Sequence, residues 1–193
     1  MEDGRIGFAF CGSYCTYGKA MNALEQVAAR WQEVVPIVSE AGVVTDTRFG
    51  QAHTWLMEME RICGCKPLTS ISEVEPIGPK KLLDALVVCP CTGNTLGKLA
   101  HGIADTAVTM AVKSHLRNGR PVILAVSTND GLGTAAENIG KLLARRDYYF
   151  VPFRQDDPEG KPRSLVAEFE MVPRTVTAAL AGKQIQPVLL GSR

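Results

Sequence analysis

The sequence predicts a three-layer α/β fold, in which a parallel β-sheet has helices on both faces. Short apolar runs alternate along the chain with segments whose apolar residues recur every three or four positions, the order expected for such a sheet. Loops rich in Gly, Ser, Thr and Asn follow three of these runs, at residues 12–16, 90–95 and 127–133. Because the carboxyl ends of parallel strands share one edge of a sheet, the three loops predict a small-molecule site there.

The composition is that of one globular domain over residues 1–193. The chain is 46% hydrophobic and 21% charged, and its formal net charge of +1 argues against a nucleic-acid or membrane surface. No apolar run reaches the roughly 18 residues that span a bilayer, and the first residues lack the layout of a signal peptide, so we expect a cytoplasmic protein. The six cysteines form C-x3-C and C-x-C pairs, which do not match zinc-binding spacings, and no metal site is expected.

The first half of the chain contains two strand–helix units. Residues 5–11 and 33–39 read as strands, and Pro36 indicates an irregular or edge position in the second. A helix follows each strand, and a short third strand is expected at 67–71. The apolar stripes of the two helices are Met21, Leu24, Val27, Ala28 and Trp31, and Phe49, Ala52, Leu56, Met59 and Cys63.

The second half continues the alternation after a loop at 72–81. One continuous helix is predicted from Asn94 through Leu116 to a stop at Asn118-Gly119. A last helical stretch at 164–181 contains Pro173, which is expected to kink or divide it. The remaining elements are strands at 85–89, 121–127 and 148–153, and a helix with Leu132, Ala136, Ile139 and Leu143 on its apolar stripe.

The segment after the strand at 85–89 is the most informative part of the chain. Its polar residues Asn94, Lys98, His101 and Asp105 recur at steps of four, three and four, so they share one face of the predicted helix. The opposite, core-facing side consists of Leu96, Leu99, Ala100, Ile103 and Ala107. A polar turn above such a stripe is typical of a ligand site; an ordinary connection with a solvated helix face is the alternative.

The other two loops are suited to polar ligands. Gly12-Ser13-x-x-Thr16 opens a helix, where backbone N–H groups and two hydroxyls favour a phosphate. It matches neither G-x-G-x-x-G nor a P-loop, so a mononucleotide or flavin phosphate is favoured over a dinucleotide. The hydroxyls and amide at 127–129 suit a carboxylate or the edge of a heteroaromatic ring. Helix capping by Ser13 and a simple turn at 127–133 are the alternatives.

No catalytic triad, paired carboxylates or H-E-x-x-H motif is present. His53 is expected to be solvated, and the helix dipole is sufficient to explain His115 near a helix C-terminus. Only His101 shares a face with other candidate site residues. Residues 155–158 read as a surface turn, or as a segment that folds over the pocket of a neighbouring subunit.

Residues 90–105 read PCTGNTLGKLAHGIAD. This segment resembles the signature P-x-[ST]-x-N-T-x-x-K-x-A-x-G-[IL]-x-D of flavodoxin-like (Rossmann-like), homo-oligomeric FMN proteins, which include phosphopantothenoylcysteine decarboxylases, lantibiotic-peptide cysteine decarboxylases and flavin prenyltransferases. Gly12-Ser13 is similar to the phosphate-binding first loop of this group. The resemblance implies an FMN protein that assembles as a trimer or dodecamer.

Within this group, the chain is most similar to the family of dipicolinate synthase B subunits of endospore-forming bacteria. The similarity covers residues 45–50, 75–81, 127–133, 151–158 and 182–189. It implies a cytoplasmic oxidoreductase subunit for sporulation, which helps to oxidise a dihydrodipicolinate-type intermediate of the lysine/diaminopimelate pathway to dipicolinate (pyridine-2,6-dicarboxylate). It also implies a partner, the A subunit of dipicolinate synthase, through which NADP would enter the reaction.

The resemblance also implies site residues, although no catalytic acid or base is assigned. Arg48 or Lys98 would offset the carboxylates of the substrate. The residues implied for FMN are Gly12, Ser13, Thr16, Pro90, Thr92, Asn94, Thr95, Asp105, Ser127, Thr128 and Asn129.

Two other functions stay open. The chain could be a non-catalytic flavin- or substrate-binding scaffold for the A subunit, or an FMN-dependent decarboxylase. The cysteine decarboxylases carry a catalytic histidine fourteen residues before the motif proline, where this chain has Pro76. Proline has no group that acts as an acid or base, so decarboxylation is disfavoured.

Overall fold

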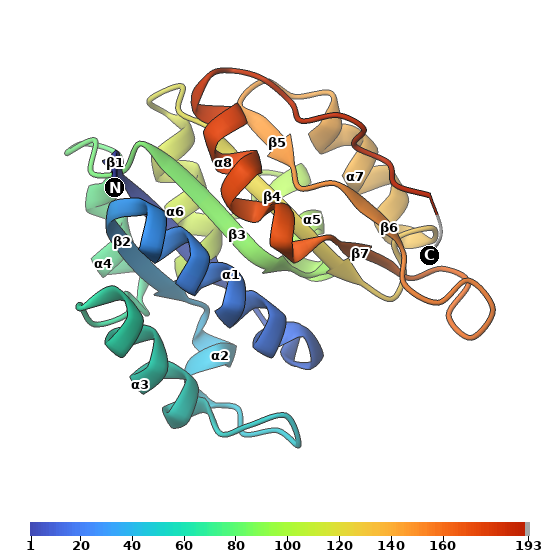
Figure 1. The fold of residues 1–193 in the computed structure, drawn as a ribbon, viewed down its shortest axis with the longest axis horizontal. Coiled ribbons are helices and arrows are strands. Elements are labelled where there is room, and N and C mark those ends of the chain that lie inside the picture. Colours follow the sequence, from blue (N-terminus) through green and yellow to red (C-terminus); the bar gives the residue numbers. More distant parts are fainter. Residues whose placement is uncertain (192–193) are drawn as a thin grey trace.

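The computed structural model describes residues 1–191 and contains a seven-stranded sheet between two layers of helices (Figure 1). Five strands are parallel in the order β2-β1-β3-β4-β5, which is the order of flavodoxin-like sheets. The predicted fold class is confirmed. The strands are β1 (Glu2–Phe10), β2 (Trp31–Val38), β3 (Ala85–Cys91), β4 (Val122–Thr128), β5 (Tyr148–Phe150), β6 (Phe153–Gln155) and β7 (Leu165–Ala167).

Helices cover both faces of the sheet, as predicted. In Figure 1, α1 and α8 lie in front of the sheet and α5, α6 and α7 lie behind it, while α3 packs beside β2. The α-helices are α1 (Tyr17–Arg30), α2 (Glu40–Val44), α3 (Ala52–Cys63), α4 (Ile71–Val74), α5 (Gly93–Ala100), α6 (Ala107–Leu116), α7 (Thr134–Leu143) and α8 (Val172–Leu180), and the 3-10 helices are η1 (Tyr14–Thr16), η2 (Glu75–Ile77) and η3 (Phe169–Met171).

The central strands are apolar because both of their faces are covered. Every residue of β3 is buried, as are the first six residues of β4, which is the pattern of strands between two helical layers. Their register places Val87 of β3 between Phe8 of β1 and Ile123 of β4. Parallel strands in this register bring the loops that follow β1, β3 and β4 to the same edge.

The strand β4 has two different neighbours on its far side. Its first three residues pair with β5 in parallel, whereas Ser127 and Thr128 pair with β7 in the antiparallel direction. Strand β6 then pairs with β7, so residues 153–167 form a β6–β7 hairpin that extends the sheet at its carboxyl edge. This hairpin was not predicted.

The continuous helix predicted from residue 94 to 116 is wrong. It is divided into α5 and α6 because Gly102 has a φ of 72°, the left-handed conformation that ends helices. Thr106 begins α6 by accepting a hydrogen bond from a backbone N–H one turn later. Ile103, predicted in the core, therefore lies in the link and is 48% exposed.

Three further predictions are corrected. Residues 67–71 contribute a single bridge between Leu68 and Ile37 rather than a strand. Residues 148–153 belong to two strands, β5 and β6, which pair with different neighbours. The stretch 164–181 begins as β7, and Pro173 does not kink a helix but occupies the first turn of α8, where proline is tolerated.

The predicted helix stripes are partly correct. The core face of α7 consists of Ala135, Ile139 and Leu142, so the predicted Leu132 and Leu143 are exposed instead. Three other residues were misplaced. Ala136 is exposed on α7, and Phe49 precedes α3 and is 44% exposed. Trp31 is buried, but it begins β2 instead of ending a helix.

Candidate functional site

The loops that follow β1, β3 and β4 surround a cavity of about 610 Å³, here called the rim cavity. Ser13 lies after β1, Asn94 in the first turn of α5, and Asn129 after β4, and all three line this cavity. Its volume falls within the range of about 300–1,000 Å³ that is usual for small-molecule sites. The structure thus brings together three polar side chains that are far apart in the sequence.

Most residues predicted to bind a cofactor lie at this cavity. Pro90, Thr95 and Asp105 do not line it, nor do the predicted carboxylate-binding residues Arg48 and Lys98. The predicted residues that line it are Gly12, Ser13, Thr16, Thr92, Asn94, Ser127, Thr128 and Asn129.

Three hydroxyl groups form a cluster at the floor of the cavity. The Ser13 and Ser127 hydroxyl oxygens are 2.8 Å apart, and the Thr16 hydroxyl lies 3.2 Å from that of Ser127. Ser13 caps no backbone N–H, so helix capping does not account for its position. The cluster lies where η1 leads into α1, and the positive end of the α1 dipole adds to its suitability for an anion.

Hydrogen bonds to neighbouring residues fix the conformation of the loop after β3. The Thr92 side chain begins α5 by accepting a hydrogen bond from the Thr95 backbone N–H at 3.1 Å, and Thr95 itself is buried. The Pro90 carbonyl accepts a hydrogen bond from the Cys11 thiol at 2.9 Å. Pro90 and Thr95 therefore support the loop, and Asn94 is left exposed at the cavity.

The loops after β3 and β4 approach each other most closely at Gly93. A Cβ atom at this position would lie 2.7 Å from Thr128 Oγ1 and 2.8 Å from Asp130 Oδ1. The Thr128 hydroxyl donates a hydrogen bond to that Asp130 carboxylate. Any side chain at residue 93 would thus displace a hydrogen-bonded pair that lines the cavity.

The predicted charged residues have other partners. Lys98 forms an ion pair with Asp105 at 2.8 Å, which holds the pKa of the Asp105 carboxyl below its usual value. The Arg48 guanidinium lies over the Phe49 ring, 4.9 Å from its centroid. Within one chain, neither cation lines the rim cavity, although the Phe49 ring that Arg48 covers does.

The cations that line the rim cavity are Lys19 and Lys161, which sequence reasoning missed. Lys161 forms an ion pair with Asp156 at 2.9 Å, within the β6–β7 hairpin. Lys19 is on α1, one turn after Thr16. The spacing of Lys19 from Thr16 could have indicated this position, whereas the hairpin gives no comparable signal.

Three of the four thiols near the cavity are buried. Burial raises the pKa values of Cys11, Cys89 and Cys91, so these thiols stay protonated. Cys15 is exposed and lines the cavity. Over residues 1–191, no group of three or more His, Cys, Asp and Glu side chains is arranged to hold a metal ion.

The histidines lie outside the rim cavity. His53 is exposed, as predicted, and His101 Nδ1 lies 2.9 Å from the Gly97 carbonyl oxygen. His115 is fully buried, with Nε2 3.1 Å from the Pro121 carbonyl oxygen, and burial lowers its pKa to about 4. His115 lies in the last turn of α6, as predicted, and its burial keeps the ring uncharged, which weakens any interaction with the helix dipole.

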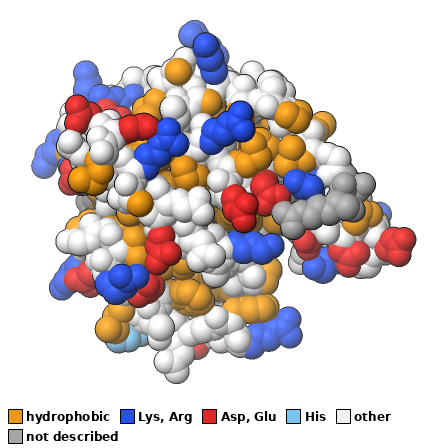
Figure 2. All heavy atoms as spheres, in the orientation of Figure 1, with side chains coloured by type: hydrophobic (Ala, Val, Ile, Leu, Met, Phe, Trp, Pro, Cys, Tyr) orange, Lys and Arg blue, Asp and Glu red, His pale blue; other side chains and the backbone are white. Residues whose placement is uncertain are grey.

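The surface carries charges of both signs. In Figure 2, Lys and Arg side chains alternate with Asp and Glu, and hydrophobic side chains lie between them. Within the part of the chain that the structure describes, no helix has the length and apolar character needed to cross a membrane.

Comparisons with known proteins show the family and the fold of the chain. The family model described as Flavoprotein matches residues 1–159. The B subunit of dipicolinate synthase from Bacillus subtilis (strain 168) is 42% identical over 186 residues, which cover 96% of this chain and 93% of that protein. The crystal structure of the B subunit of dipicolinate synthase from Bacillus halodurans C has a TM-score of 0.90 and 41% identity, and the match covers 98% of this chain and 97% of that one.

A more distant structure shares the fold. The FMN-dependent cysteine decarboxylase SpaF has a TM-score of 0.66 and 20% identity, over 92% of this chain and 95% of that one.

Proposed function

Because the chain belongs to the Flavoprotein family, and within it to the dipicolinate synthase B subunits, we propose that it binds FMN in the rim cavity. In this proposal it takes part in the oxidation of a dihydrodipicolinate-type intermediate of the lysine pathway to dipicolinate during sporulation. Its partners are the A subunit of dipicolinate synthase, which brings NADP, and further copies of itself in a trimer or dodecamer.

The convergence of Ser13, Asn94 and Asn129 on one cavity is the observation that carries this proposal. The donors present fit the chemistry of a flavin mononucleotide. A hydroxyl cluster next to a helix start suits the phosphate, and two exposed carboxamides suit the carbonyl and N–H edge of the isoalloxazine ring.

Each part of the site has its own task. Ser13, Thr16 and Ser127 hold the phosphate, while Asn94 and Asn129 orient the ring. Thr92 and Thr128 keep the two ring-binding loops in place, as their hydrogen bonds within the loops indicate. If the flavin lies between subunits, Asp105 and Lys98 belong to the site of a neighbouring copy.

The flavin, when bound, supplies the capacity to accept two electrons from the ring that becomes aromatic. The protein positions the substrate and excludes water. The two carboxylates that line the cavity, Asp130 and Asp156, each accept a hydrogen bond from a neighbouring side chain. No histidine lines the cavity within residues 1–191.

A non-catalytic scaffold for the A subunit is the second candidate function. It is favoured by the lack of a histidine at the rim cavity and by the engagement of both lining carboxylates, which leaves no evident general base.

The absorbance spectrum of the purified protein, with and without added FMN, tests the flavin proposal. We expect retained FMN with visible absorption bands; a colourless protein that never retains FMN would contradict it. The variant Asn94→Ala, with Asn138→Ala on α7 as a control, then separates the two functions when flavin occupancy is recorded together with activity in the presence of the A subunit. Loss of activity in parallel with flavin supports the redox role, and full activity without flavin supports the scaffold.

A further inference from the structure

A second recess, of about 230 Å³, opens beside the rim cavity. The two spaces share Lys19, Asp156 and Val166 as lining residues, so they are adjacent at this point. The recess is smaller than the roughly 300 Å³ at which drug-sized ligand sites begin. It is therefore suited to a small molecule, or to part of a larger one that enters from the rim cavity.

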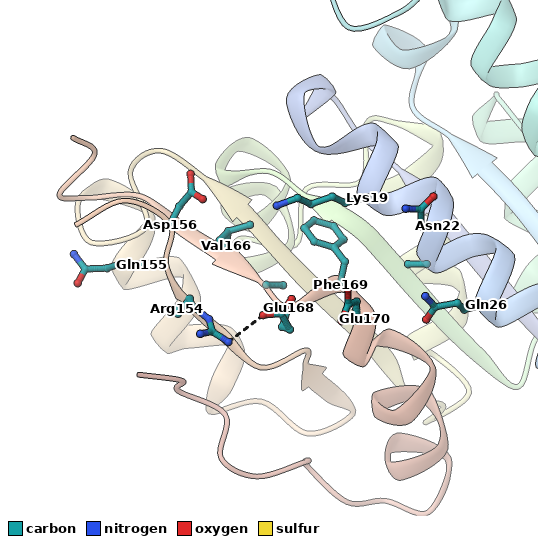
Figure 3. A pocket seen from close by; sticks show the side chains of 12 residues that line it. Lys19, Asn22, Gln26, Arg154, Gln155, Asp156, Val166, Glu168, Phe169 and Glu170 are labelled. Atoms are coloured by element: carbon teal, nitrogen blue, oxygen red, sulfur yellow. Dashed lines mark hydrogen bonds and ion pairs between the residues drawn. The ribbon is translucent and has the colours of Figure 1, made fainter. Parts of the chain in front are cut away.

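One side of the recess is formed by hydrogen-bond donors on α1. Lys19, Asn22 and Gln26 are spaced by three and four residues, so they share one helical face, and all three line the recess. Figure 3 shows Lys19 extending from α1 toward Asp156 and Val166 of the β6–β7 hairpin. This face of α1 is directed at a cavity instead of open solvent.

The opposite side is formed by residues whose charges are mostly compensated. Arg154 forms an ion pair with Glu168 at 3.0 Å, and both side chains are only about one-fifth exposed. Asp156 is paired with Lys161 on the hairpin. Of the charged side chains that line the recess, Lys19 and Glu170 form no ion pair with another residue of the described range 1–191.

Lys19 is the cation available to a ligand at the junction. Among residues 1–191, no carboxylate forms an ion pair with its ammonium group, although it lines both spaces. Glu170 lines only the recess, whereas Lys19 also lines the rim cavity. An anionic group at the junction would therefore meet Lys19 rather than Glu170.

The molecule thus contains two groups of donors that could hold an anion. The hydroxyls of Ser13, Thr16 and Ser127 line the rim cavity alone, whereas Lys19 also lines the recess. If FMN places its phosphate at the hydroxyl cluster, Lys19 is left for a second anionic group. We propose, on the basis of the proposed function, that Lys19 binds one carboxylate of the small dicarboxylate ligand and directs that ligand into the junction of the two spaces.

The proposal is tested by measuring pyridine-2,6-dicarboxylate binding to the full chain by titration calorimetry, with and without FMN. We expect Lys19→Gln to weaken this binding about tenfold, the effect of losing one charge-assisted contact, and Lys19→Arg to restore most of it. Lys66→Gln, at an exposed position after α3, is the matched control and should bind like the wild type. Lys19 is exposed on α1, so its replacement should leave the fold intact.

The alternative anion is the flavin phosphate, and riboflavin identifies it because riboflavin lacks that group. If Lys19→Gln weakens FMN binding while riboflavin binding is unchanged, Lys19 holds the phosphate and the inference is overturned. Unchanged dicarboxylate binding in Lys19→Gln also overturns it. A wild type that binds the dicarboxylate through Lys19 but never binds FMN supports this inference and contradicts the flavin proposal.

Discussion

The close approach of two loops at Gly93 gives a sharp prediction for the variant Gly93→Ala. The new Cβ atom would lie 2.7 Å from Thr128 Oγ1 and 2.8 Å from Asp130 Oδ1, where ordinary contacts begin at 3.4 Å. The two atoms are hydrogen-bonded to each other and have to move together. The strain therefore acts on the loop that carries Asn129.

The magnitude follows from two opposing effects. Overpacking costs about 1–3 kcal/mol, and replacement of a helical glycine by alanine returns up to about 1 kcal/mol. We expect the free energy of unfolding to fall by about 0–3 kcal/mol in Gly93→Ala. Loss of one hydrogen bond to the ligand, about 0.5–1.5 kcal/mol, would weaken FMN binding roughly 2- to 10-fold.

Urea unfolding and titration of flavin fluorescence measure these two effects. Gly97→Ala, on the same helix, is the control, since its Cβ would lie 3.5 Å from Asn138 Nδ2 in ordinary contact. The control should keep wild-type FMN affinity and equal or greater stability. If Gly93→Ala behaved like Gly97→Ala in both assays, the approach of the two loops would not constrain the cavity.

Three further predictions concern the phosphate position, a helix end and a buried ring. Ser127→Ala removes one hydroxyl from the cluster that lines the rim cavity. We expect this variant to bind FMN about 2- to 10-fold more weakly and to bind riboflavin with unchanged affinity. An equal loss of affinity for both ligands would be inconsistent with a phosphate at the cluster. Arg145→Ala removes hydrogen bonds of 3.0 and 2.6 Å to the last carbonyls of α5 and should cost about 1–3 kcal/mol of unfolding free energy, whereas Arg146→Ala should change it by less than about 0.5 kcal/mol. Burial lowers the pKa of His115 from 6.5 to about 4, so only the unfolded chain binds this proton in that window and stability falls as the pH drops through it. The loss of unfolding free energy approaches about 3 kcal/mol. The His115→Gln variant should lack this pH dependence, and the control His53→Gln should keep it. Equal pH slopes of stability against urea in both variants would refute the role of His115.

The central part of the fold was predictable because its signals are local and periodic. Strands β1, β3 and β4 are runs of apolar residues bounded by polar turns, and parallel pairing then places the three loops together. The division of α5 from α6 was missed because the polar spacing continues across Gly102. Lys98 and Asp105, predicted to share one helix face, form an ion pair at 2.8 Å, although Asp105 is not in a helix.

The rest of the site depends on contacts that no short pattern reveals. Strands β6 and β7 contain three residues each, too few to show a period, so Asp156 and Lys161 could not be placed at the cavity. Lys19 lies on a polar helix face, and only the position of the hairpin converts that face into the side of a recess. Most predicted residues of the three loops line the cavity, whereas Lys19 and the residues of the β6–β7 hairpin were not predicted.

The β6–β7 hairpin beside the rim cavity is hydrogen-bonded to residues 188–190. The Phe153 N–H donates to the Val188 carbonyl at 3.0 Å, and the Leu190 N–H donates to the Phe153 carbonyl at 2.9 Å. A fluorescent reporter or affinity tag attached just after Leu190 would thus pull on the hairpin that borders the rim cavity. Met1, which is 88% exposed, is the safer point of attachment for biosensors or immobilised forms of this protein.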